Sequence, residues 1–468
     1  MINRAIARLW VLFVLLFIGL ILRQAYVQLV AGPQIAAHPG NPRRALPNRR
    51  RGSILATDGT VLAKTVGAHR VYPLGRELAQ IVGYDSVRYG TSGIEAAYDR
   101  ALSPAPTSGD PAAQVQALLA ALRGSTAAVR GANVVTTIVP AIQRELYAEL
   151  AAHARAAGVV LDPHTGAVLA IASVPSFDPN TLAASFPRLL HDSQAPLLDR
   201  ALDGLYPPGS TFKIFTSSAA LDTGAVTLHS TFYDPGYYYI GKFRLHNAGH
   251  EVTGRSDLTR AFALSVNVDY AQVALRLGLA EFYRYLHRWQ IGSSLDFQLP
   301  TEPARYPPES SITPSELAQM GFGQGALLVS PLQMALIAAT VANGGVEPRP
   351  YIVRQIVRAG AVASTYSGGT LSTPISAETA AEVTKMMLAV VRYGTGTSAA
   401  LPGVLVAGKT GTATNPRGVA DSWFVCFAPA QAPKAVVAIV VENAGYGAAV
   451  AAPIARDVMR IALQSMRS

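Results

Sequence analysis

Cysteine is almost absent from this chain. Its 468 residues include one, Cys426, so no disulfide framework can form within the chain. Cys426 lies in an apolar run, where we expect it to be buried and unreactive. The nine histidines show neither the H-E-x-x-H spacing nor cysteine partners, so we expect no zinc site. The sequence therefore predicts a protein that needs no disulfide, no metal and no cofactor.

Acidic residues are also few. The chain has 29 aspartates and glutamates against 39 lysines and arginines, which gives a net charge of +10 and a pI ≈ 9.7. Such a charge favours polyanionic partners in general. No nucleic-acid-binding motif accompanies it, so we expect no nucleic-acid partner. Half of the residues are hydrophobic, which is enough for a sizeable core in two or three domains.

The longest apolar run lies near the N-terminus, at residues 9–22. As a helix this run measures about 21 Å, which is less than the roughly 30 Å of a bilayer core. Apolar neighbours at 5–6 and 26–30 extend it to spanning length if Arg8 and Arg23 snorkel. We predict a single transmembrane helix with its N-terminal end in the cytoplasm and the remaining chain outside. A cleaved signal peptide, ending near 31–32, is the alternative interpretation.

Lysine is scarce too, since there are six, and two of them lie in short polar motifs. Ser210 and Lys213 form an S-x-x-K motif after the chain break at 207–209, and the residues that follow predict a buried helix. Both side chains share one helix face, with the hydroxyl at the positive end of the helix dipole. A desolvated lysine can accept the proton of a serine nucleophile, whereas an arginine cannot. Taken alone, the motif is equally compatible with a capping serine and a surface lysine.

A second motif, Ser265-Val266-Asn267, follows residues 258–264, which we predict as a short helix. Ser265 and Asn267 would then emerge together on one turn. A hydroxyl at this point can relay a proton, and an amide can both donate to and accept from a peptide bond. The pattern is weak by itself, because many structural turns contain the same residues.

The third motif, Lys409-Thr410-Gly411-Thr412, lies between two apolar runs at 404–407 and 423–428. We predict both runs as buried strands, joined by a turn near 415–418. On an edge strand, Lys409 can attract a carboxylate while Gly411 lets another backbone approach closely. The Thr412 amide could pair with the Ser210 amide to hold an oxyanion. The alternative is a strand end with a snorkelling lysine.

With its three motifs in this order, the chain resembles a class B penicillin-binding protein, a serine transpeptidase of bacterial peptidoglycan. The resemblance extends over nearly the whole chain. The further segments that carry it are 51–54, 58–59, 89–95, 158–180, 198–201, 206–209, 321–325, 330–335 and 393–397.

The resemblance implies a multidomain α+β or α/β fold. It comprises an N-terminal transmembrane helix, a small β-rich pedestal, and a large transpeptidase domain whose antiparallel sheet is flanked by helices and joined to an all-helical subdomain. We place the cytoplasmic end and anchor at 1–30, the linker and the pedestal or dimerisation-like module at 31–157, and the transpeptidase domain at 158–468. Local patterns predict helices at 112–122, 141–157 and 453–466, and strands at 133–139 and 435–442.

The resemblance also implies a D,D-transpeptidase mechanism. Ser210 would attack the carbonyl of a penultimate D-alanine, Lys213 would accept its proton, and Ser265 would relay a proton to the leaving D-alanine. An amine from a neighbouring stem peptide would then resolve the acyl-enzyme and form a cross-link. The remaining site residues would bind the stem peptide and its terminal carboxylate: Asn267, Lys409, Thr410, Gly411 and Thr412.

Two other functions remain open. One is a hydrolase of the same fold, either a D,D-carboxypeptidase or a β-lactamase, although the chain lacks the Glu-x-x-Leu-Asn element by which one class of β-lactamases supplies a deacylating base. The other is a non-catalytic penicillin-binding sensor. The intact motifs argue against the sensor.

The implied location is the bacterial cell membrane, with a single anchor and an extracytoplasmic catalytic domain. The implied partners are peptidoglycan stem peptides, β-lactam antibiotics, a glycosyltransferase of the SEDS family and other elongation or division proteins. A basic cluster after the anchor would meet anionic lipid or wall polymers, or would simply be solvated. Its members are Arg43, Arg44, Arg49, Arg50 and Arg51.

Overall fold

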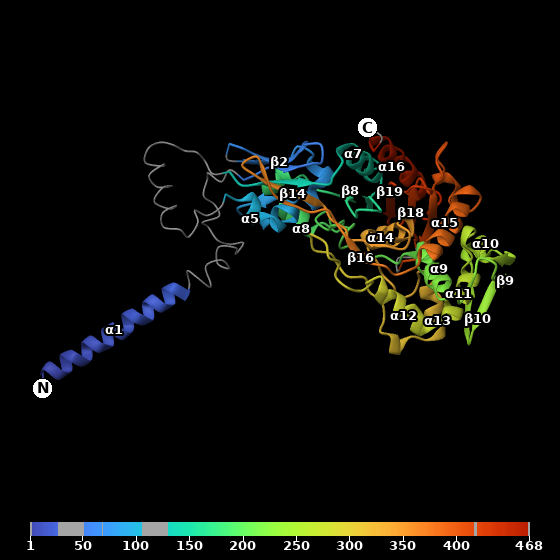
Figure 1. The fold of residues 1–468 in the computed structure, drawn as a ribbon, viewed down its shortest axis with the longest axis horizontal. Helices are drawn as coiled ribbons and strands as arrows, with labels where there is room; N and C mark the ends of the chain where they lie inside the picture. The colour runs from blue at the N-terminus through green and yellow to red at the C-terminus, as the bar shows by residue number, and fades with distance from the viewer. Residues whose placement is uncertain (1, 27–50, 68, 105–129, 416–418, 467–468) are drawn as a thin grey trace.

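The computed structural model describes residues 2–26, 51–67, 69–104, 130–415 and 419–466 (Figure 1). The helix predicted at 112–122 and the arginines of the basic cluster up to Arg50 lie outside these residues.

A five-stranded antiparallel sheet forms the centre of the larger part, in the order β17-β18-β19-β7-β8. Nearly all of its residues are buried, which agrees with the continuous apolar runs of the sequence. Strand β19 shows the alternation clearly, because Val436 and Ala438 face one hydrophobic core and Val437 and Ile439 face another. The strand bounds are β7 Ala156–Leu161, β8 Val168–Val174, β17 Ala407–Ala413, β18 Asp421–Ala428 and β19 Ala435–Val441.

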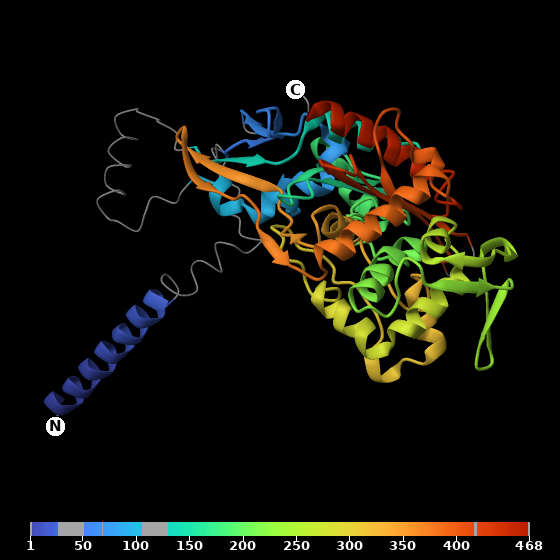
Figure 2. The same ribbon diagram turned by 45° about the vertical axis from the view of Figure 1, so that its right-hand side comes forward.

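Helices cover both faces of this sheet (Figures 1 and 2). Helices α7 (Pro140–Ala151) and α16 (Ala451–Ser465) pack together on one face. Helices α14 (Pro331–Ala342) and α15 (Ala377–Arg392) pack on the other face, and α9 (Lys213–Asp222) packs against both of them. The motif strand β17 is the outer strand of the sheet, so one of its edges has no strand neighbour within the described part of the chain.

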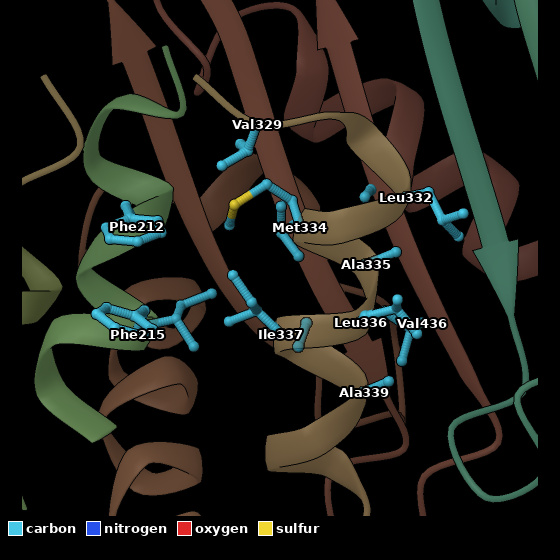
Figure 3. Close-up of a cluster of buried hydrophobic side chains, with 14 of the residues drawn as sticks. Phe212, Phe215, Val329, Leu332, Met334, Ala335, Leu336, Ile337, Ala339 and Val436 are labelled. Atoms are coloured by element: carbon cyan, nitrogen blue, oxygen red, sulfur yellow. The ribbon is translucent and has the colours of Figure 1, made fainter. Parts of the chain in front are cut away.

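Helix α14 is buried along its whole length and links the sheet to the segment that carries Ser210. Ser330 and Gln333 form a capping box at its start, and Pro331 occupies its first turn. Figure 3 shows Met334 and Ile337 of this helix on the side of Phe212 and Phe215. The aromatic rings of Phe212 and Phe215 are stacked, with centroids 4.6 Å apart. The Ser210 segment is therefore backed by a close-packed core.

A second sheet, in the order β15-β14-β6-β1-β2-β3, forms the N-terminal module. Two neighbouring strands at one side of this sheet, β15 and β14, come from much later in the chain. Strand β14 pairs antiparallel with β6. The domain boundaries at 30 and 157 stay a prediction. The sheet contains strands from both sides of residue 157. The strand bounds are β1 Ile54–Leu55, β2 Val61–Val66, β3 His69–Val71, β6 Asn133–Thr136, β14 Val353–Arg358 and β15 Ala361–Thr365.

Arg51 belongs to the core of this module, so its assignment to a solvated or lipid-facing basic cluster was wrong. The residue is 6% exposed. Its Nε lies 2.8 Å from Glu95 Oε2, and its Nη1 donates to Asp99 Oδ1 at 2.5 Å. Glu95 is itself fully buried and also pairs with Arg70. A buried carboxylate requires cationic or hydrogen-bonding partners. The cluster of arginines in the sequence does not reveal which of them is such a partner.

The lobe on the other side of α9 was expected to be all helical, and this expectation was wrong. Two short sheets accompany its helices, β9 with β12 and β10 with β11. Strands β9, β10 and β11 are rich in aromatic residues and are joined by turns that contain Gly236 and Gly241, a pattern that favours strands. The bounds are β9 Thr231–Asp234, β10 Tyr237–Ile240, β11 Phe243–His246, β12 Gly254–Asp257, α10 Leu258–Ala263, α11 Asn267–Leu277, α12 Leu279–Arg288 and α13 Pro314–Gly321.

Helix α1 (Ile2–Tyr26) contains the apolar run at 9–22, whose large hydrophobic side chains are exposed. Among the helical residues that the structure describes in full, no stretch is both long and apolar enough to cross a membrane.

Candidate active site

Three backbone segments lie in close contact and fix the position of Ser210. Residues Gly209–Phe212 form a single 3-10 turn (η5) that leads into α9. Gly209 has φ +55°, and a Cβ at this position would lie 2.9 Å from the carbonyl oxygen of Thr412. A Cβ on Gly323 would lie 1.9 Å from the carbonyl oxygen of Gly209. Only glycine allows this contact, which brings the Ser210 turn against the motif strand β17.

Lys213, at the start of α9, is completely buried. Its Nζ donates to the carbonyl oxygen of Ser265 at 2.7 Å and to Asn267 Oδ1 at 2.8 Å. Burial lowers the pKa of Lys213 well below its usual value, the positive charge of Lys409 lowers it further, and Asp269 opposes both. Desolvation disfavours the charged form of an amine, so these surroundings favour the neutral form of Lys213.

The second motif forms the turn between α10 and α11. Ser265 has φ +62°, a left-handed conformation that is uncommon for a residue with a side chain. This turn directs its carbonyl toward Lys213, and α11 begins at Asn267 immediately afterwards. The Ser265 hydroxyl lies between two amines, 3.5 Å from Lys213 Nζ and 2.8 Å from Lys409 Nζ. A hydroxyl can accept from one amine while donating to the other, so Ser265 can move a proton between them.

Lys409 is the second fully buried lysine, and it lies on β17. Its Nζ donates to Ser265 Oγ at 2.8 Å and to the carbonyl oxygen of Thr410 at 3.0 Å. Burial lowers the pKa of Lys409 to about 7. The bound carboxylate of a substrate would favour the charged form and restore the ammonium. The Thr410 hydroxyl is 2.5 Å from that of Thr395, which orients it.

A cavity of about 250 Å³ opens over these groups. The residues of the three motifs that line it are Ser210, Ser265, Val266, Asn267, Thr410 and Thr412. Lys213 and Lys409 are buried among these residues and are joined to Ser265. Gly411 faces the Ser210 segment, because a Cβ there would lie 2.9 Å from the carbonyl oxygen of Pro208. The structure thus gathers all of the predicted site residues around one cavity.

Several residues at the site had not been predicted from the sequence. Asn247 lines the cavity and accepts hydrogen bonds from the start of α11. Asp269 is buried behind Lys213 and acts on its charge. The segment 393–397 carried a family resemblance that could have pointed to Thr395, whereas no motif marks Asn247 or Asp269.

Fold and site together are those of a class of serine acyltransferases, with a serine and a buried lysine beside one cavity. Comparisons agree: a family model described as the penicillin binding protein transpeptidase domain matches residues 156–460, and one described as the penicillin binding protein A dimerisation domain matches residues 51–134. The first covers more than half of the chain. The chain belongs to the penicillin-binding protein family, and the resemblance to class B members is confirmed.

Known relatives are similar over most of this chain. Peptidoglycan D,D-transpeptidase PbpA of Mycobacterium tuberculosis is 34% identical over 99% of both chains. Peptidoglycan D,D-transpeptidase MrdA of Haemophilus influenzae is 32% identical over 72% of this chain and 57% of its own. The penicillin G acyl-enzyme complex of penicillin-binding protein A from M. tuberculosis superposes with a TM-score of 0.80 at 32% identity, covering 89% of this chain and all of that one. The D,D-transpeptidase domain of an Eggerthella lenta protein gives 0.81 at 33% identity, covering 90% and 99%.

Proposed function

We propose that Ser210 is the nucleophile of a peptidoglycan D,D-transpeptidase and that Lys213 is its general base. One observation supports this most strongly: Lys213 is fully buried, is hydrogen-bonded to the Ser265-Asn267 turn, and lies one helical turn after Ser210. An amine in such surroundings gives up its proton and can take one from a serine. The names of the relatives and the penicillin G acyl-enzyme of one neighbour support the same reaction.

The positions of the groups support the following reaction. Ser210 Oγ attacks the carbonyl carbon of the penultimate D-alanine as its proton passes to Lys213. Ser265, which contacts both amines, returns a proton to the nitrogen of the departing D-alanine. An amine of a neighbouring stem peptide then attacks the ester carbonyl, and its proton passes through Ser265 to Lys213. Lys213 gives this proton to Ser210 Oγ as the ester C–O bond breaks, so that the serine is released and a new peptide bond is formed.

Substrate binding uses the free edge of β17. The terminal carboxylate of the donor stem lies against Lys409, Thr410 and Thr412, and Asn267 holds the peptide amide. Gly411 permits the close approach of the Ser210 segment that brings the Ser210 and Thr412 amides together as an oxyanion hole.

Intact-protein mass spectrometry with benzylpenicillin tests the nucleophile. The wild-type protein should gain the mass of one penicilloyl group, and Ser210→Ala should gain none. Ser185→Ala, at a half-buried serine on α8 (Leu182–His191), is the matched control and should be acylated like the wild type. An adduct of equal yield on Ser210→Ala, or none on the wild type, contradicts the assignment.

Turnover distinguishes the transpeptidase from the hydrolases. With a chromogenic β-lactam, a transpeptidase gives a burst equal to the enzyme concentration, followed by slow release. A β-lactamase gives rapid steady-state hydrolysis. Cross-linking of stem peptides by the purified protein excludes a non-catalytic sensor, and release of D-alanine without cross-links indicates a carboxypeptidase.

We also propose that α1 attaches the protein to the cell membrane, with the catalytic part outside and a SEDS-family glycosyltransferase as its partner. The exposed apolar side chains of residues 9–22 support the attachment. Fractionation of cells that express the full chain should place it in the membrane and in a complex with the glycosyltransferase. A chain that starts at residue 51 should be released. Equal release of the full chain would contradict the proposal.

A further inference from the structure

The helix that follows the second motif begins without a capping residue of its own. The N-cap of α11 is Val266, whose side chain has no hydrogen-bonding group. The first amides of a helix have no partner within the helix, and serine, threonine, asparagine or aspartate usually satisfy them. Because Ser265 and Asn267 serve the cavity, neither neighbour is available for capping. The start of α11 therefore needs an acceptor from elsewhere.

Asn247, twenty residues earlier in the chain, supplies that acceptor. Its Oδ1 accepts from the backbone amide of Asn267 at 2.9 Å and from that of Val268 at 3.0 Å. Asn247 comes directly after β11, is 9% exposed and lines the cavity. One side chain thus closes the first turn of α11 and holds the residue whose Oδ1 accepts from Lys213.

Asp234, at the end of β9, fixes the orientation of Asn247. The Asn247 Nδ2 donates to Asp234 Oδ2 at 2.7 Å and to the carbonyl oxygen of Glu251 at 2.9 Å. The fully buried Asp234 also accepts from both the amide and the hydroxyl of Thr253 and from the amide of Gly236. With its donor end held by a carboxylate, the Asn247 amide can turn only its oxygen toward α11.

We propose that Asn247, anchored by Asp234, is a positioning residue for acylation: it fixes Asn267 and, through Asn267, the amine of Lys213. The proposal rests on the proposed function, because it assigns Asn247 to the same site. Aspartate cannot replace Asn247. It has the same shape and a charge that suits a helix start, but it lacks the donor and would repel Asp234.

The second-order rate constant for acylation by benzylpenicillin, measured from pH 5 to 9, tests the proposal. For Asn247→Ala we expect the maximum to fall by about 10- to 100-fold, as for loss of a group that supports a catalytic constellation. The acidic limb of the pH profile should move to lower pH. Asn267 Oδ1 accepts from Lys213 Nζ and stabilises its ammonium form, and a displaced Asn267 would stabilise that form less. A merely structural role would reduce the fraction of active enzyme, seen as burst amplitude, without moving the limb.

A matched control is Asn180→Ala. Asn180 also bridges two segments, with its side chain bonded to both the amide and the carbonyl of Tyr72, but it lies at the N-terminal module. This variant should keep the wild-type rate constant and pH profile. Asn247→Asp should be as impaired as Asn247→Ala, and Asp234→Asn combined with Asn247→Asp should recover part of the rate, because the donor and the acceptor of the bridge are exchanged.

The outcomes separate the two claims. If the wild-type protein is not acylated at Ser210, the proposed function fails. If the wild type is acylated and Asn247→Ala matches it in both rate constant and pH profile, the positioning role alone is overturned. Should Asn247→Ala fail to fold, the comparison of Asn247→Asp with the double variant decides: a double variant no faster than Asn247→Asp overturns the role.

Discussion

The two buried lysines at the site have different surroundings and different tasks. Lys213 has its amine held by the Ser265 carbonyl and Asn267, and its pKa is lowered by burial and by the charge of Lys409. Lys409 lies on the sheet edge, where burial lowers its pKa to about 7. In the proposed reaction, a carboxylate that binds beside Lys409 would restore its ammonium, and that charge would in turn lower the pKa of Lys213 further. Substrate binding would then favour the free base through the charge of Lys409, whose amine contacts the same Ser265 hydroxyl as Lys213.

Replacement of Lys213 by arginine should abolish acylation although the positive charge is retained. A guanidinium stays protonated and cannot accept the Ser210 proton. We expect a loss of at least about 1000-fold in the acylation rate constant, near the upper range for loss of a general base. Lys434→Arg, at an exposed position, is the control and should behave as the wild type. Wild-type acylation by Lys213→Arg would refute the base assignment.

Asp269 should set the pH at which the enzyme begins to work. Its carboxylate raises the pKa of Lys213, against the effects of burial and of Lys409. In Asp269→Asn that opposing charge is lost, so the Lys213 pKa falls and the free amine persists to lower pH. We expect the acidic limb of the pH profile for acylation to shift toward acid by about one unit, within the usual range for a nearby charge. An unchanged or alkaline-shifted limb would show that Asp269 does not act on Lys213.

At the scale of single residues, the motif residues were predictable because each motif has a fixed local spacing. Ser210 and Lys213 lie one turn apart on a helix, so their proximity follows from the sequence alone. Asn247 was missed because it caps a helix twenty residues away, and its loop conformation decides that contact. Asp269 reads as an ordinary polar position of α11, and its burial depends on how β12 covers the helix.

Among the elements, the Ser210 turn depends most on backbone contact. The Gly209 amide donates to the carbonyl of Gly323 at 2.9 Å, and Gly323 has φ +79°. Gly323→Ala would place a Cβ 1.9 Å from the Gly209 oxygen, so the Ser210 turn must shift relative to the Gly323 segment. We expect acylation to fall by about 100-fold, the scale of a misplacement near 1 Å.

Gly224→Ala is the control that distinguishes the effect of this contact from the effect of backbone strain. Gly224 also has a positive φ, +71°, but a Cβ there meets no atom within 4 Å. Both variants pay the cost of a left-handed alanine, about 1 kcal/mol, and the control should keep its acylation rate constant. Equal rate constants for the two variants would show that the close approach at Gly323 does not position Ser210.

Continuous runs of apolar residues made several elements predictable. The runs at 423–428 and 435–442 became β18 and β19, and the closing helix predicted at 453–466 became α16. The run at 404–407 was placed too early: β17 starts at Ala407 and contains the third motif, while Leu405 is 51% exposed. A buried strand that carries Lys409 and two threonines has no apolar pattern, so only its pairing with β18 defines it.

At the scale of the whole molecule, strand pairing and hydrogen bonds join the N-terminal module to the larger part. Strand β14 pairs with β6 although more than two hundred residues separate them in the chain. Thr137, next to β6, donates through its hydroxyl to the carbonyl of Val168 on β8. Local sequence patterns carry no information about such long-range pairing, which explains why the module was predicted from 31–157 without its two outer strands.

The buried charges of the N-terminal module should stabilise the protein without affecting the reaction. Among the residues that the structure describes, Arg51→Ala leaves the buried Glu95 with Arg70 as its remaining cationic partner, which should lower the free energy of unfolding by about 3 kcal/mol. Arg305→Ala breaks an ion pair in which the arginine is 65% exposed and should cost less than about 1 kcal/mol. Urea unfolding measures both. A large fall in the acylation rate constant of folded Arg51→Ala would contradict a purely structural role.

The ionisation of Lys213 can be observed directly, because the chain has only six lysines to resolve. NMR of protein labelled with ¹³C at the lysine ε-carbons, with Lys213→Arg used to assign the signal, follows each amine from pH 5 to 11. We predict that the Lys213 signal titrates well below the usual 10.5. A Lys213 signal that titrates at or above 10.5 would mean that the amine is charged at neutral pH and cannot be the base.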